Sequence, residues 1–201
     1  TGVQTCALPI CLQGGHECLR GPGTFEAAWA GLLAAKEAGL DVSCATMIHA
    51  GNIQELEELG ERLREVGVRE WNLDVPCLSG RLTAHQDLYL EPAAAAPFLS
   101  LGFGGAAHGA DENFACGRHL AAVLPDGRVA KCGLFAREPL GRLAEGLETC
   151  WQRLEHIPLE KLECAACEHL RECRGGCRFR AGAGLAPDPV MCALYGVGKD
   201  R

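Results

Sequence analysis

The chain has 201 residues, of which 48% are hydrophobic and 22% are charged, a composition typical of a protein that folds around a core. Its net charge of −7 argues against a general surface for nucleic acids or anionic membranes, and it has no apolar run of the about eighteen residues that a membrane span needs. Thirteen cysteines are too many for an ordinary cytosolic enzyme, yet no signal peptide indicates an oxidising compartment. Reduced, metal-binding thiolates in a cytoplasmic protein fit both facts.

Residues 1–10, "TGVQTCALPI", contain a small apolar run with no basic segment ahead of it. They therefore do not have the pattern of a secretory signal.

Residues 24–76 predict two units of helix followed by strand. The first helix has Thr24 as its expected N-cap and Gly39 as its stop, and "DVSCATMI" after it is typical of a strand. The second helix has Asn52 and Glu55 in capping-box register and Gly67 as its stop, before the strand-like "VREWNLDVP". This alternation predicts parallel strands joined by right-handed crossovers, and so an α/β sheet or barrel.

From about Ala93 the sequence becomes rich in Ala, Gly and Pro, which predicts a short helix, a long connection and a domain boundary near residue 100. Beyond it, two apolar runs flank Pro-Asp-Gly at residues 125–127, a pattern typical of a hairpin. "LETCWQRLEHI", residues 147–157, predicts one amphipathic helix. The remainder has little room for long regular elements.

The cysteines of the second half cluster in a metal-ligand pattern. The stretch "CAACEHLRECRGGC" has the spacing C-x2-C-x5-C-x3-C, which lets one short loop present several sulfurs to one centre. Two more thiols lie at the ends of the predicted hairpin, and another follows downstream. The seven are Cys116, Cys132, Cys164, Cys167, Cys173, Cys177 and Cys192.

Three other readings compete with iron–sulfur ligation. A structural zinc site would use four thiolates and leave three without a role. Disulfides would need an oxidising compartment and would leave one of seven unpaired. Buried apolar cysteines explain single residues but not the clustering. Iron–sulfur ligation is favoured because seven thiolates nearly fill two four-thiolate clusters.

These seven cysteines, with Gly127 between the first two, resemble the signature of the SPASM domain, the auxiliary-cluster domain of many radical SAM enzymes. In the first half, "CLQGGHECLRGPGTF" resembles that family's fourth barrel strand and following loop. The two units after it resemble the closing half of the partial barrel. The resemblance covers residues 11–201.

The resemblance implies two four-iron four-sulfur clusters. Cys164, Cys167, Cys173 and Cys192 would hold one, and Cys177 would join Cys116 and Cys132 at the other. In family members with eight cysteines, the fourth ligand of the second cluster comes from shortly before the position of Cys116, where this chain has "HGADENFA". That iron would therefore be open to a substrate or bound by His108, Asp111 or Glu112.

A radical SAM enzyme also needs a third cluster, bound by C-x3-C-x2-C, which chelates S-adenosylmethionine. That motif and the first three barrel strands are absent, so we expect a fragment with no turnover of its own. Residues 1–10 resemble a translated short-read sequencing adapter, since ACT GGA GTT CAG ACG TGT GCT CTT CCG ATC encodes them. We expect 1–10 to be an artefact, 11–100 a truncated barrel and 101–201 the SPASM domain.

Several residues have individual expectations. Arg20 stands where the family often contacts the carboxylate of S-adenosylmethionine, and a loop salt bridge is its alternative role. Cys44, Cys77 and Cys150 are most simply core residues, although Cys77 lies at a strand's carboxyl end, where barrel active sites lie. The basic residues Arg171, Arg174, Arg178 and Arg180 would compensate the charge of anionic clusters.

The expected parent is a radical SAM maturase that modifies a peptide or protein substrate and receives electrons from a donor. In that family a deoxyadenosyl radical abstracts hydrogen from the substrate, while auxiliary clusters bind substrate or pass electrons. No nucleic-acid or membrane partner is expected. The alternatives are a stand-alone cluster-binding or peptide-docking protein without catalysis, and a structural zinc-binding module.

Overall fold

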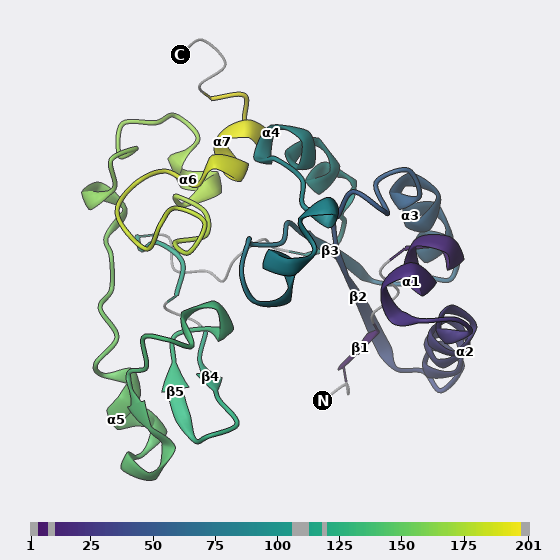
Figure 1. Cartoon of the computed structure of the whole chain (residues 1–201), viewed down its shortest axis with the longest axis horizontal. Helices are drawn as coiled ribbons and strands as arrows, with labels where there is room; N and C mark the ends of the chain where they lie inside the picture. The colour runs from purple at the N-terminus through teal and green to yellow at the C-terminus, as the bar shows by residue number, and fades with distance from the viewer. Residues whose placement is uncertain (1–3, 8–10, 106–112, 118–119, 198–201) are drawn as a thin grey trace. The chain divides into compact units, whose positions relative to one another are not determined.

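The computed structural model of the chain describes residues 4–7, 11–105, 113–117 and 120–197 (Figure 1). The chain packs as two compact units, residues 1–107 and 108–201. The boundary that the sequence predicts, near residue 100, lies a few residues before this division. Each unit is described by itself below.

The first unit is built on a small parallel sheet. Its strands, in the order β1-β2-β3, are β1 (Gln4–Ala7), β2 (Asp41–Met47) and β3 (Glu70–Asp74). The register pairs Gln4 with Asp41 and Ser43 with Glu70, and both ladders are parallel. The parallel α/β arrangement is confirmed, while the strands of the described residues form no closed barrel. The segment 4–7, which the sequence analysis sets apart, thus lies in the sheet beside β2.

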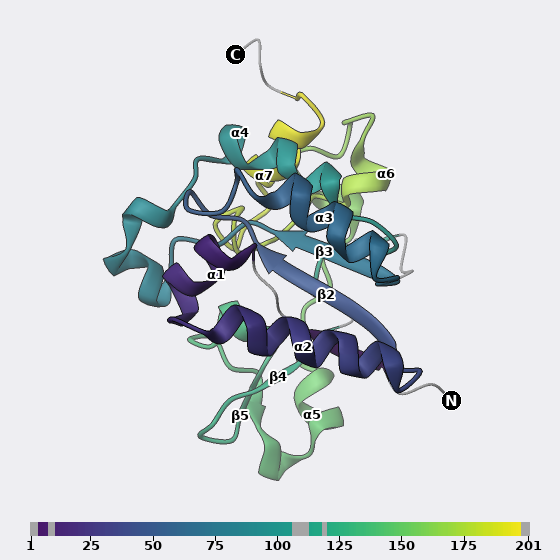
Figure 2. The same ribbon diagram turned by 90° about the vertical axis from the view of Figure 1, so that its right-hand side faces the viewer.

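Two of the predicted helices are present on one face of this sheet, as Figure 2 shows: α2 (Thr24–Glu37) and α3 (Leu56–Glu65). The chain leaves them through Gly39 and Gly67, whose φ angles of 74° and 72° lie in the left-handed region that favours glycine. The predicted stops are therefore confirmed. The predicted start of the first helix is one residue off, because Gly23 is the N-cap and the Thr24 hydroxyl donates to the Gly21 carbonyl at 2.6 Å.

The expectation of a strand and loop at residues 11–25 was wrong, since helix α1 (Gln13–Arg20) occupies much of this stretch and α2 begins at Thr24. The Gly15 amide, in the first turn of this helix, donates to both carboxylate oxygens of Glu55, at 3.2 and 3.3 Å. First-turn amides have no partner within their own helix, so a carboxylate from another part of the chain stabilises this helix start.

The predicted capping box was also wrong. The N-cap of α3 is Glu55, whose side chain makes no capping bond there. Asn52 instead fixes the turn after β2: its Oδ1 accepts from the His49 amide at 2.8 Å, and its Nδ2 donates to the Met47 carbonyl at 2.9 Å. The Asn52 side chain is fully buried, so water cannot replace it as the hydrogen-bond partner that connects β2 to the turn.

We expect Asn52→Ala to lower the free energy of unfolding of the first unit by about 2 kcal/mol, because it removes the hydrogen-bond partner of the buried His49 amide and of the part-buried Met47 carbonyl. Urea denaturation followed by circular dichroism measures this change. Gln54→Ala, at an exposed position two residues away, is the control and should change little. Equal stability of the two variants would contradict a structural role for Asn52.

The second unit begins with the predicted hairpin. Strands β4 (Ala122–Val123) and β5 (Arg128–Ala130) pair antiparallel. Gly127 has a φ of 78°, and the Asp126 carboxylate accepts from the Arg128 amide at 3.1 Å, which closes the turn. The hairpin is confirmed, and the structure adds a third strand, β6 (Gly141–Arg142), that the sequence analysis missed.

The predicted helix over residues 147–157 is shorter in the structure. Helix α5 (Leu147–Trp151) ends early because the following segment is extended and pairs elsewhere. The Ala115 amide donates to the Ile157 carbonyl at 2.9 Å, and the Leu159 amide donates to the Asn113 carbonyl at 3.0 Å. These long-range bonds need extended backbone where the local sequence favours helix. Cys150 on α5 is buried, as predicted.

The other elements are short. The helices are α4 (Pro92–Ala95), α6 (Leu170–Cys173) and α7 (Pro189–Leu194). Single 3-10 turns lie at Gly80–Ala84, Gln86–Leu88, Ala96–Leu101, Gly133–Phe135, Leu143–Glu145 and Leu159–Lys161. In the second unit, a small cluster of Ala115, Leu159, Leu162 and Leu170 forms the core against which Cys164 and Cys167 pack.

Candidate metal centre

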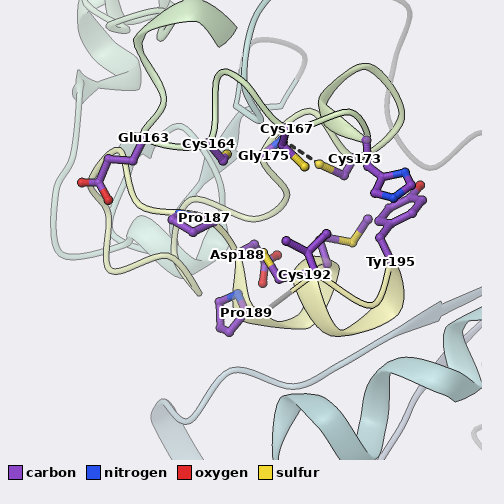
Figure 3. A pocket seen from close by; sticks show the side chains of 13 residues that line it. Glu163, Cys164, Cys167, Cys173, Gly175, Pro187, Asp188, Pro189, Cys192 and Tyr195 are labelled. Atoms are coloured by element: carbon purple, nitrogen blue, oxygen red, sulfur yellow. Dashed lines mark hydrogen bonds between the residues drawn. The ribbon is translucent and has the colours of Figure 1, made fainter. Parts of the chain in front are cut away.

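Four of the predicted ligands line one pocket of about 500 Å³ in the second unit (Figure 3). They are Cys164, Cys167, Cys173 and Cys192. In Figure 3 the side chains of the first three lie along one wall and that of Cys192 lies opposite. The pocket therefore gathers the four thiols that the resemblance assigns to a single cluster.

Tight backbone turns place the thiols of Cys164, Cys167 and Cys173 on one wall of the pocket. The Cys167 amide donates to the Cys164 carbonyl at 2.9 Å, and the Gly175 amide contacts the Cys173 sulfur at 3.4 Å. Gly176 has a φ of 68°, and a Cβ there would lie 2.5 Å from the Asp188 side chain. Only glycine allows the loop to pass this close to Asp188.

Asp188 holds the fourth thiol in place and ties it to the loop. Its carboxylate caps α7 by accepting from the Val190 amide at 3.0 Å, and Cys192 lies on that helix. The same carboxylate accepts from the Cys177 amide at 2.7 Å and pairs with Arg180 at 2.8 Å. Since the Asp188 side chain is fully buried, these bonds form a rigid connection within the second unit.

The three other predicted ligands form a second group. Cys116 follows the Ala115 pairing described above, Cys132 follows β5, and Cys177 follows Gly176. The thiols of Cys177 and Cys132 lie near enough to that of Cys116 for their charges to act on it. The structure thus places four of the seven cysteines on one pocket, and the assignment of the other three to a second centre stays a prediction. That either group holds iron remains a prediction.

Burial dominates the ionisation of these thiols. It raises the pKa of Cys173 and of Cys192, and negative charge on neighbouring thiols and on Asp188 raises both further. Burial also raises the pKa of Cys116, as do Cys177 and Cys132, whereas Lys131 and Arg178 act in the opposite direction. Two cations therefore partly offset the rise in the pKa of Cys116.

Arg178, which follows Cys177 in the sequence, is a buried cation. Its side chain is 1% exposed, and its Nη atoms donate to the carbonyls of Gly175, Gly184 and Ala186. Within the part of the chain that the structure describes, Nε has no hydrogen-bond partner and no carboxylate pairs with the guanidinium. Burying a cation without a counter-charge costs free energy. Clustered thiolates around a metal centre would supply the negative charge.

The described ranges contain no disulfide and no group of three His, Cys, Asp or Glu side chains spaced for a single metal ion. The candidate fourth ligands of the second group, His108, Asp111 and Glu112, lie outside the described residues. Among residues 11–105, 113–117 and 120–197, no helix has the length and apolar character to span a bilayer.

The remaining expectations concern the first unit. Arg20 lies exposed in the last turn of α1, and a role for it in cofactor binding remains a prediction. Cys44 is fully buried in β2, as predicted, and Cys77 is half-buried after β3. Cys11 is also fully buried; burial and the nearby Glu55 carboxylate raise its pKa to about 12, so its thiol is protonated near neutral pH.

Two residues of the site were not found from the sequence. Asp188 precedes Pro189 at the start of α7, and an Asp followed by Pro is an N-cap pattern that predicts a helix start there. Its bonds to Cys177 and Arg180 have no such local signal. Lys131, which acts on Cys116, is one lysine in a hairpin strand and has no distinguishing pattern.

Comparison of the sequence with models of known protein families gave no match, and comparison with curated proteins gave none either.

Proposed function

We propose that residues 108–201 bind two iron–sulfur clusters, as an auxiliary-cluster domain of the SPASM type. Cys164, Cys167, Cys173 and Cys192 would hold one cluster, and Cys116, Cys132 and Cys177 would supply three ligands of the other. The observation that carries the proposal is the convergence of the first four thiols on one pocket. Clusters bound here would supply one-electron chemistry and, at an open iron, a binding point for substrate.

The size of the pocket supports a cluster over a single ion. Zinc–sulfur bonds of about 2.3 Å would bring four sulfurs to about 3.8 Å from one another. A four-iron core is larger and needs its thiolates spread around a cavity, and four thiols around about 500 Å³ have that arrangement. Arg178, which is buried and has no carboxylate partner among the described residues, supports an anionic centre in this unit as well.

For the whole protein, we propose a radical SAM maturase that acts on a peptide or protein and receives electrons from a donor. The support is the resemblance of residues 11–201, together with the parallel α/β sheet of the first unit. In such an enzyme the second unit would hold the auxiliary clusters, and chemistry at S-adenosylmethionine would need a further cluster. The seven cysteines of the second unit would hold only the auxiliary clusters, and would neither bind nor cleave S-adenosylmethionine.

Anaerobic reconstitution of the 201-residue chain with iron and sulfide tests the proposal. We expect about eight irons and about eight acid-labile sulfides per chain, with broad absorbance near about 400 nm, because two four-iron clusters have that composition. Iron and zinc are measured on the same sample. One zinc per chain with no sulfide would contradict iron–sulfur binding and identify a structural zinc module instead.

A further inference from the structure

We propose that Arg178 is a positioning residue for the pocket of four thiols. It holds Gly175 in the orientation in which the Gly175 amide donates to the sulfur of Cys173, and this hydrogen bond raises the reduction potential of a cluster bound there. The inference rests on the proposed function, because it concerns the cluster in the pocket. It assigns to Arg178 a role that acts through the backbone of Gly175.

The first step is that Arg178 connects the two ends of one loop. Its side chain is 1% exposed, and Nη1 donates to the carbonyls of Gly184 and Ala186, at 3.2 and 2.8 Å. Nη2 donates to the carbonyl of Gly175, at the other end of the loop. The planar guanidinium presents its donors in a fixed arrangement, so one side chain fixes both ends. Breaking this connection costs free energy, because it leaves buried carbonyls without a donor.

The second step is that Gly175 belongs to the wall of the pocket. Its amide lies 3.4 Å from the Cys173 sulfur, and Figure 3 marks this hydrogen bond. Gly175 has a φ of 77°, and a Cβ there would lie 2.5 Å from the Leu162 side chain. Glycine has wide conformational freedom, so contacts from other residues must fix its orientation. Arg178 supplies such a contact at the carbonyl of the same residue.

The third step is the charge of Arg178. Among the described residues no carboxylate pairs with the guanidinium, and Nε has no hydrogen-bond partner. Carbonyl oxygens carry no net charge, so a positive charge stays buried against a residue of the pocket wall. A thiolate-bound cluster becomes more negative when it gains an electron. A hydrogen bond to a ligand sulfur and a nearby cation both stabilise that state, and both therefore raise the potential.

The neighbouring arginines differ from Arg178 in their contacts. Arg180 also bonds to a residue of the wall, but its partner is the Asp188 carboxylate at 2.8 Å, which neutralises its charge. Arg171 is exposed, so solvent screens it. Arg171 thus offers a matched control in the same stretch of sequence.

The test isolates the pocket cluster and measures its potential. With Cys132→Ser as the background, the reconstituted full chain should keep the pocket cluster alone. Dithionite supplies the electron in an anaerobic titration, and electron paramagnetic resonance follows the reduced cluster. Arg178→Met in this background should weaken reduction about tenfold, which lowers the potential by about 59 mV for one electron. Arg171→Met should leave the potential unchanged.

Two further measurements separate positioning from charge. Arg178→Lys keeps a positive charge, but one ammonium group lacks the fork of donors that reaches both ends of the loop. Its potential should therefore lie below that of the unsubstituted background. Hydrogen exchange of the reduced, iron-free chain follows the amides of residues 174–177 and needs no bound cluster. Arg178→Met and Arg178→Lys should both exchange faster there, and Arg171→Met should not.

Two results would overturn the inference while the proposed function stands. One is a pocket potential that Arg178→Met leaves unchanged. The other is Arg178→Lys with an unchanged potential and unchanged exchange, which would leave a role for the charge alone. If Arg178→Met takes up no iron in the pocket, Arg178→Lys and the exchange measurement decide the question. A wild-type chain that binds no iron would contradict the proposed function itself, and iron analysis before each titration identifies that outcome.

Discussion

Cys173→Ser is expected to lower the iron bound by the reconstituted chain from about eight atoms to about four, because the substitution removes one of the four thiolates that hold the pocket cluster. Cys173 is buried on the pocket wall, and its sulfur accepts from the Gly175 amide at 3.4 Å. The group at Cys116, Cys132 and Cys177 should keep its iron. Iron and sulfide analysis, with the spectrum of the remaining cluster, measures the change.

The matched variant in the other group is Cys132→Ser, which should remove the other half of the iron and leave the pocket cluster in place. Cys150→Ser is the control. Cys150 is fully buried in the same unit, but its sulfur contacts the Arg142 carbonyl, and a serine hydroxyl can make that bond as well. We expect it to leave iron content unchanged. Equal loss of iron in all three variants would show that the effect is on folding and not on ligation.

Asp188→Ala is expected to lower the free energy of unfolding of the second unit by about 3–5 kcal/mol, the usual cost of removing one partner of a buried ion pair. The substitution removes the Asp188 carboxylate from its ion pair with the Arg180 guanidinium, which is 13% exposed. It also removes the acceptor of the Cys177 and Val190 amides. Denaturant unfolding of the anaerobic, reconstituted chain measures the loss.

Asp188 is bonded to parts of both cysteine groups, so its loss should also lower the iron content of both. Cys177 belongs to the group of three, and α7 carries Cys192 of the group of four. Asp126→Ala is the control, because Asp126 is fully exposed and pairs with Arg128 in a surface turn. It should leave iron content unchanged. Normal iron loading in Asp188→Ala would show that the two groups form independently of this carboxylate.

The parts of the fold that were predictable from the sequence are those governed by neighbouring residues. The stops at Gly39 and Gly67 and the turn at Gly127 depend on a backbone conformation that glycine adopts at low cost. The parallel sheet follows from alternating helix and strand patterns. The clustering of Cys164, Cys167 and Cys173 follows from their spacing, because short turns keep such residues together.

The errors arise where distant segments compete with local preference. Residues 152–157 have a helical pattern, but bonds to residues 113–115 keep the end of that segment extended. Glu55 suits a capping box with Asn52, yet its carboxylate binds the amide of Gly15, forty positions earlier. Asn52 then bonds back to β2. In the first two cases the partner lies far along the chain, whereas Asn52 bonds to backbone atoms only three and five positions earlier.

By itself the sequence determined the α/β class of the first half, the hairpin, and a set of seven thiols in a metal-ligand pattern. These depend on residue type and short spacing. Only the tertiary structure decided that four of the thiols line one pocket, that Asp188 ties Cys177 to α7, and that Arg178 is buried without a carboxylate partner among the described residues. Burial and pairing arise when segments far apart in the chain pack together, and no local pattern contains that information.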